Sequence, residues 1–244
     1  MIYDKEEYGN HMSMKKAVRV KRTKSAALMA KNSTEWVFQF WAWQLLAWSL
    51  YRYFFRLPEP IDEFVVKPLV FILPVVWFVL KKEHRGLDSI GITTKNLFQS
   101  ILIGCGFGLL FGGEAILANT LKYGSLTLSP VPALLQYGLP MIVALSLATS
   151  ISEEILSRGF FFSRLFEASK NLVQSVIMST LLFVAFHIPI LLTSLRFQGT
   201  TLILFFMTSF VLGIANSLIF HKTKSLVAPI LIHLFWNVTV AVFL

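Results

Sequence analysis

Long apolar runs recur along this chain and are separated by short links rich in Lys and Arg. Each run holds about 20 residues, which is what an α-helix needs to cross the hydrocarbon core of a bilayer. Hydrophobic residues make up 55% of the chain, charged residues 14%, and the mean hydropathy is +0.67. The pattern predicts an all-α polytopic membrane protein with its helices in one bundle, and it excludes an ordinary soluble domain.

The runs predict seven transmembrane helices. Their expected ranges are 36–57, 64–80, 97–119, 133 to the Glu153-Glu154 pair, 171 to about 187, 200–220 and 226–244. The fourth helix should continue towards residue 170 as an amphipathic extension, because charged and apolar residues alternate there. Pro189 predicts a break or kink, and an eighth span follows if residues 188–195 dip back into the membrane. Residues 1–35 are predicted to form a basic cytoplasmic tail and residues 36–244 the transmembrane domain, with residues 133–244 as its motif-bearing core.

The net charge of +9 does not indicate nucleic acid. The Lys and Arg residues gather in the tail and in the links, where they suit anionic lipid headgroups. If the N-terminus is cytoplasmic and seven spans alternate, all but five of the 22 Lys and Arg lie inside, as the positive-inside rule requires. Those five are Arg52, Arg56, Lys67, Lys122 and Arg196. We therefore expect an integral protein of a bacterial plasma membrane with a cytoplasmic N-terminus.

The third run carries glycines at four-residue spacing, Gly104, Gly108 and Gly112. This spacing places them on one helical face, which predicts close packing against another helix. Glu114 in the same run lies near its end, so an acid at headgroup level or a hydrogen-bonded structural acid is favoured over a functional one. The single cysteine, Cys105, has no partner for an internal disulfide.

Ionisable residues interrupt three of the later runs. Glu153, Glu154 and Arg158 stand at the end of the fourth run, and the fifth and seventh contain His187 and His233. A charged side chain within a membrane span costs about 2.5–3.5 kcal/mol on insertion scales, so it usually faces the protein interior or a water-filled cavity. These residues predict a buried polar site.

Chain geometry allows these groups to meet. The expected turn near Lys170 lies midway between Glu153 and His187, so an antiparallel hairpin returns the chain to the same depth. His233 and Asn237 are four residues apart and share one helical face. Taken singly, each group has a structural interpretation: a helix-end charge cluster, a hydrogen-bonded histidine, or packing between helices. Together on three spans they favour a site in which all four converge.

The two adjacent glutamates face about 100° apart on a helix and cannot do the same job. Glu154 precedes Arg158 by four residues, the favoured order for a helical ion pair, so we expect that pair to be structural or to orient the site. Glu153 has Ser157 in the equivalent position and no cation. Its carboxylate is therefore expected to be free to act as a base.

Three motifs follow one another along the chain: Glu153-Glu-Ile-Leu-Ser-Arg158, Phe183-Val-Ala-Phe-His187 and His233-Leu-Phe-Trp-Asn237. In this order they resemble the motifs of the CPBP intramembrane endopeptidases, which include the CAAX prenyl proteases and bacterial Abi-type proteins. Residues 210–213 and 224–229 also look like elements of this family, so the resemblance covers about residues 133–244. It implies hydrolysis, within the membrane, of a membrane-associated protein or peptide, whether or not that substrate is lipidated.

The resemblance and the residue chemistry lead to one assignment of roles. Glu153 is expected to be the general base that deprotonates a water, and His187 helps to hold that water. His233 and Asn237 are expected to donate hydrogen bonds to the oxyanion. No cofactor is expected.

Three alternatives stay open. Glu153, His187 and His233 could form a three-ligand zinc site with an open water position, although the chain has no His-Glu-x-x-His pair. The same residues could form the proton or ion path of a transporter or channel. The protein could also be a non-catalytic scaffold that binds a peptide or lipid.

Overall fold

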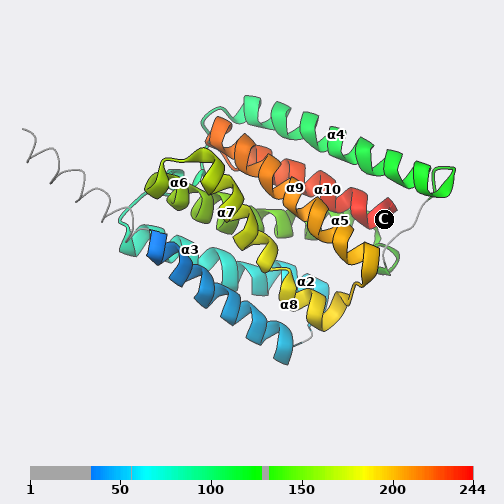
Figure 1. The fold of residues 1–244 in the computed structure, drawn as a ribbon, viewed down its shortest axis with the longest axis horizontal. Coiled ribbons are helices and arrows are strands. Elements are labelled where there is room, and N and C mark those ends of the chain that lie inside the picture. The colour runs from blue at the N-terminus through cyan, green and yellow to red at the C-terminus, as the bar shows by residue number, and fades with distance from the viewer. Residues whose placement is uncertain (1–33, 56, 128–131, 244) are drawn as a thin grey trace, which may run out of the picture.

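The structure is a computed structural model that describes residues 34–55, 57–127 and 132–243, and this part of the chain is helical without strands (Figure 1). Among the described residues, five helices are long and apolar enough to cross a membrane: Glu59–Lys82, Leu97–Leu121, Leu134–Ser169, Leu172–Leu195 and Gly199–Thr223. A shorter apolar helix, Val227–Val242, follows them, and a helix at residues 34–54 precedes them. Each of the seven predicted spans therefore corresponds to a helix, which confirms the all-α polytopic class. The predicted basic tail, residues 1–35, lies almost wholly outside the described residues.

The helices consist of shorter elements in chain order. The elements are α2 (Glu59–Ile61), η1 (Asp62–Val66), η2 (Pro68–Ile72), α3 (Leu73–Trp77), η3 (Phe78–Lys82), η4 (Leu87–Ile90), α4 (Leu97–Tyr123), α5 (Pro132–Glu154), η5 (Ile155–Phe162), α6 (Ser163–Ser169), α7 (Leu172–Ala185), α8 (Ile188–Ile190), η6 (Leu191–Leu195), α9 (Gly199–Thr223) and α10 (Val227–Phe243). All the η elements are π-helical except η4, which is a 3₁₀ turn. In Figure 1, α4 lies on one side of the bundle and the helix of residues 34–54 lies on the opposite side.

The helix Glu59–Lys82 accommodates its two interior prolines, Pro68 and Pro74, through π-helical turns. The Lys67 N–H bonds to the Asp62 carbonyl, five residues back, immediately before Pro68 begins the next π-helical segment. Proline lacks an N–H, and a local π adjustment is one way in which a membrane helix re-satisfies its backbone. π-helical turns are also frequent at functional sites. In this helix they bracket Lys67.

The helix Leu134–Ser169 joins α5, η5 and α6 and is kinked at Gly138, where φ is 75°. At 1.5 Å per residue the part after this kink, residues 139–169, is roughly 46 Å long, still beyond the roughly 30 Å of a bilayer core. Its last turns carry the predicted charged extension as continuous helix. Arg164 pairs there with Glu83 at 2.5 Å, and Glu167 pairs with Arg85 at 2.7 Å. The pairing raises the pKa of Arg85, chiefly through the hydrogen bond to Glu167.

The helix Leu172–Leu195 contains Pro189 but does not turn back. Near the proline the helix tightens, and the His187 N–H bonds to the Val184 carbonyl three residues earlier at 3.0 Å. It then continues through α8 and η6. Residues 188–195 therefore extend the fifth helix, and the alternative of a separate eighth span does not apply.

The glycine face of α4 packs closely against α10, as predicted. A Cβ at Gly104 would meet the Leu231 side chain at 2.8 Å, and one at Gly108 would overlap the ring of Phe235. A Cβ at Gly112 would meet another α10 side chain at 3.1 Å. No larger residue fits at the first two positions unless the helices separate. Glu114 lies on an exposed face of the same helix.

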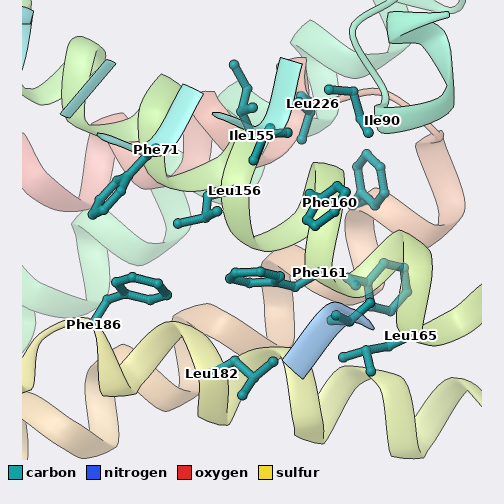
Figure 2. Packing of buried hydrophobic residues seen from close by; sticks show 14 of the residues in the cluster. Phe71, Ile90, Ile155, Leu156, Phe160, Phe161, Leu165, Leu182, Phe186 and Leu226 are labelled. Atoms are coloured by element: carbon teal, nitrogen blue, oxygen red, sulfur yellow. The ribbon is translucent and has the colours of Figure 1, made fainter. Parts of the chain in front are cut away.

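The hydrophobic core surrounds η5, directly after the glutamate pair. Phe160, Phe161 and Phe162 are at most 1% exposed. Figure 2 shows Phe161 beside Phe186 of the fifth helix, and the two rings stack with centroids 6.2 Å apart. Phe71 of η2 contacts Phe186 edge to face at 5.3 Å. The core thereby joins three helices immediately beside the polar site and fixes their rotation.

Candidate active site

Glu153 and Glu154 occupy the last turn of α5, where the α-helix gives way to the π-helical η5. Being adjacent, they point into different surroundings. The Glu154 side chain is completely buried, whereas that of Glu153 keeps 13% of its surface exposed. This difference already separates a structural carboxylate from one that can reach a substrate or water.

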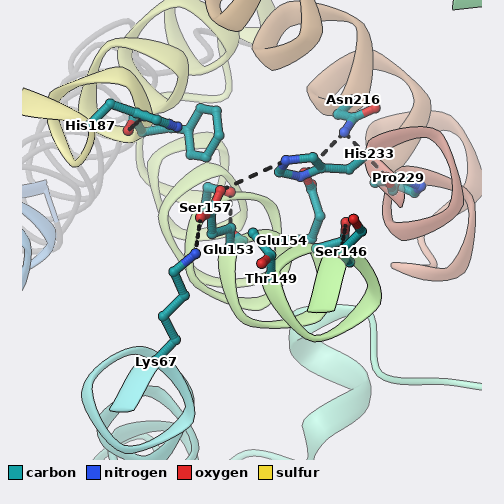
Figure 3. Close-up of polar contacts among 12 residues, drawn as sticks. Lys67, Ser146, Thr149, Glu153, Glu154, Ser157, His187, Asn216, Pro229 and His233 are labelled. Atoms are coloured by element: carbon teal, nitrogen blue, oxygen red, sulfur yellow. Dashed lines mark hydrogen bonds and ion pairs between the residues drawn. The ribbon is translucent and has the colours of Figure 1, made fainter. Parts of the chain in front are cut away.

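One oxygen of Glu154 collects three donors from three elements (Figure 3). Its Oε1 lies 3.0 Å from Arg158 Nη1, 3.0 Å from Asn216 Nδ2 and 2.9 Å from His233 Nδ1. The predicted Glu154–Arg158 pair is confirmed. Asn216 also donates to the Pro229 carbonyl at 3.3 Å, so this carboxylate joins η5, α9 and α10. Asn216 lies outside the three sequence motifs, and an amide within an apolar run was the available signal for it.

The contact with Glu154 determines which nitrogen of His233 carries hydrogen. Nδ1 faces a carboxylate that can only accept, so Nδ1 must be the protonated nitrogen. Nε2 then points towards Glu153, with 3.8 Å between Nε2 and Oε2. That distance is longer than a hydrogen bond and suits a small molecule held between the two groups.

Glu153 has a cation, contrary to our expectation. Its Oε1 lies 3.0 Å from Lys67 Nζ, and the same ammonium lies 2.8 Å from Glu63 Oε1. The other oxygen of Glu63 accepts a hydrogen bond from Thr149. The expectation was wrong because it considered only cations on the helix of Glu153 itself, whereas Lys67 comes from a different helix. The assignment of Lys67 to an outside link was wrong too, since it is only 8% exposed within the bundle.

The other two predicted residues are placed differently. His187 Nδ1 lies 3.3 Å from the Phe183 carbonyl, and the His187 ring packs edge to face against Phe183 and Phe205. It lines the same cavity as Glu153. Asn237 does not line this cavity, and its side chain has no hydrogen bond to another described residue.

The cavity has a volume of about 140 Å³. It offers room for a few waters, since each occupies about 30 Å³ in the liquid. Its polar groups come from Lys67, Glu153, Ser157 and His187, and the rest of its wall is apolar. The apolar lining residues are Trp48, Phe71, Leu156, Phe183, Phe186, Ile190, Leu195 and Phe205.

The alternative zinc ligands, Glu153, His187 and His233, all lie in the described part of the chain. No group of three His, Cys, Asp or Glu side chains is arranged there to hold a metal ion. The Lys67 ammonium lies against Glu153 and the Arg158 guanidinium lies against Glu154.

The fold and the site together define an integral membrane protein whose helices enclose an acid–histidine cluster beside a small cavity. Residues 135–239 match the Rce1-like family, described as type II CAAX prenyl endopeptidase Rce1-like. This segment is similar to that family, which confirms the resemblance to the CPBP and CAAX proteases and supports an intramembrane endopeptidase. It carries Glu153, His187 and His233, whereas Lys67 lies before it. Neither a curated protein nor a solved structure matches the chain.

Proposed function

We propose that the protein hydrolyses a peptide bond in a membrane-associated protein or peptide, with a water activated by Glu153. One observation carries the proposal: Glu153 Oε2 faces His233 Nε2 across 3.8 Å, beside a cavity, within the segment that matches the endopeptidase family. A carboxylate and an imidazole in this arrangement can hold a water and move its proton.

In the proposed reaction Glu153 takes a proton from water as the water oxygen bonds to the peptide carbonyl carbon. The carbonyl electron pair moves to its oxygen and forms an oxyanion. The His187 Nδ1–H is directed to the Phe183 carbonyl, so its Nε2 is the nitrogen that would accept a hydrogen bond from the water. The C–N bond then breaks, and the leaving nitrogen takes the proton that Glu153 acquired.

Stabilisation of the oxyanion is assigned to α10. In its imidazolium form His233 would donate through Nε2, because Nδ1–H is already held by Glu154. Asn237, one turn further along α10, is proposed as the second donor. Its amide would have to turn towards the bound substrate, since it lies outside the cavity wall.

Cleavage of a peptide library tests the function. Purified protein in detergent would be incubated in ¹⁸O-water with membrane-anchored peptides, with and without a prenylated cysteine, and the products read by mass spectrometry. We expect ¹⁸O in one new carboxylate, and none with Glu153→Ala. The prenylated and unprenylated arms decide the substrate class. Proton or ion flux in proteoliposomes without any cleavage would replace the proposal by the transporter alternative.

We propose that catalysis is independent of metal. Protein freed of metal by a chelator should keep its cleavage rate to within about twofold, because the groups beside Glu153 and Glu154 are protein cations. Metal content would be measured on the same active sample. Stoichiometric zinc that is lost together with activity, and restored with it, would contradict the prediction.

The orientation is proposed from charge. Of the five Lys and Arg assigned to outside links, Arg52 and Lys67 are buried and paired within the bundle, which increases the asymmetry of the charges left in the links. The protein would be placed in a bacterial plasma membrane with its single cysteine replaced, Cys105→Ala. In that protein, Ser125→Cys should react with an impermeant maleimide added from outside. Asp88→Cys should react only after permeabilisation. The reverse labelling pattern would contradict a cytoplasmic N-terminus.

A further inference from the structure

Lys67 is a buried cation in contact with the candidate catalytic carboxylate. It comes from the helix Glu59–Lys82, which precedes the segment that matches the endopeptidase family. Its ammonium lies 3.0 Å from Glu153 (Figure 3) and 2.8 Å from Glu63, and its side chain lines the cavity. An ionisable residue within a membrane-spanning helix is rare unless it is paired and has a function.

The contacts around Lys67 hold it in one place. Glu63 is itself fixed, because its second oxygen accepts a hydrogen bond from Thr149 on α5. Lys67 is therefore tied to α5 twice, once through Glu63 and Thr149 and once through Glu153. An ammonium fixed in this way constrains the rotation of the Glu153 carboxylate, because turning it would break a charge-assisted hydrogen bond in a buried site.

We infer that Lys67 is the positioning residue of the reaction: it holds Glu153 Oε1, so that Oε2 faces His233 and the cavity. The inference rests on the proposed function, since it concerns the carboxylate that acts as base there. Lys67 acts through Glu153. Lys67 lies in the N-terminal half of the chain. Its contact with Glu153 therefore comes from outside the segment, residues 135–239, that carries the family motifs.

The same contact gives the rate a pH dependence that involves Lys67. Three helices other than that of Glu153 bring charged or titratable groups to it. One supplies Lys67 and Glu63, and the other two supply His187 and His233. The helix of Glu153 itself adds Glu154 and Arg158. Without the Lys67 charge, Glu153 would be left near the Glu63 carboxylate with no cation between them. An anionic base is harder to form beside a second anion, so the acidic limb of the rate profile should move to higher pH.

The test compares Lys67→Met with Arg52→Met. Arg52 is also a buried cation of the N-terminal helices, paired with Asp62 at 2.6 Å, but neither member of that pair contacts Glu153. Lys67→Met should lower kcat about 100-fold with KM changed less than threefold, as expected for a misplaced catalytic group. The acidic limb of its pH–rate profile should shift to higher pH by about one unit or more. Lys67→Arg should recover part of the rate, and Arg52→Met should keep the wild-type pH profile even where it lowers thermal stability.

A double variant covers the case in which Lys67→Met does not fold. Lys67→Met with Glu63→Gln removes one positive and one negative charge together, so the net charge of the cluster is unchanged. It should fold and show the same loss of kcat. Wild-type kcat and pH profile in the double variant, or in folded Lys67→Met, would overturn the inference. A Glu153→Ala protein that cleaves normally would instead overturn the proposed function, so the two failures are distinguishable.

Discussion

Replacing Glu153 by glutamine is expected to abolish cleavage while leaving folded protein in normal amount. General base catalysis typically contributes about 10²–10⁴-fold, so kcat should fall by about 10³-fold. Glutamine keeps the size of the side chain, and its carbonyl oxygen can still accept a hydrogen bond from Lys67, which also retains Glu63 at 2.8 Å. The fold should therefore tolerate the change. Cleavage rate, expression level and thermal stability in detergent would be measured on the same preparation.

Glu63→Gln is the matched control for Glu153→Gln. It removes one negative charge from the same Lys67, but Glu63 is not among the residues that line the cavity. We expect it to keep the cleavage rate within about tenfold of wild type, because Glu63 is not the group that takes the proton from water. Normal turnover by Glu153→Gln would remove the general-base assignment. An equal loss of cleavage rate in both variants would mean that the rate depends on the charge balance around Lys67 rather than on Glu153 as the base.

The Glu154→Gln variant should show the largest loss of stability. Glu154 is the carboxylate partner of Arg158, whose side chain is 1% exposed. Breaking a buried ion pair by removing one partner typically costs about 3–5 kcal/mol, because the remaining charge has no compensation. Thermal unfolding in detergent should occur at a clearly lower temperature, and the yield of folded protein should fall.

The same variant should slow cleavage without abolishing it. Loss of the charge weakens the contact that fixes the His233 tautomer, and loss of such an outer contact typically costs about 10–100-fold in activity. The rate would be measured at a temperature at which the variant is folded. Adding Arg158→Met should recover stability but not rate, since it removes the uncompensated charge and leaves His233 without its partner. Unchanged stability in Glu154→Gln would contradict the structural role of this carboxylate.

The helical class followed from the sequence because its cause is local. A run of about 20 apolar residues must satisfy its backbone hydrogen bonds internally in lipid, and a helix does this within the run itself. The same holds for contacts between residues four apart on one helix. The Glu154–Arg158 pair and the shared face of Gly104 and Gly108 were therefore predictable from spacing alone.

The sequence also showed which helices carry the chemistry, because charged and histidine residues stand out in apolar runs. Glu153 and His233 were predicted to meet, and they face each other across 3.8 Å. For Glu153 and His187, which line the same cavity, the prediction depended on a hairpin returning to the same depth, which is a matter of counting residues. It did not depend on how each helix is rotated about its axis.

Only the tertiary structure decided which side chains pair across helices. Lys67 contacts Glu153 and Asn216 contacts Glu154, while Asn237 stays outside the cavity wall. Each outcome depends on helix rotation, which the π-helical turns before Pro68 and after Glu154 alter by adding residues to a turn. A periodicity read along one helix cannot specify that rotation. Here it is determined by the packing of the phenylalanines of η5 against the neighbouring helices.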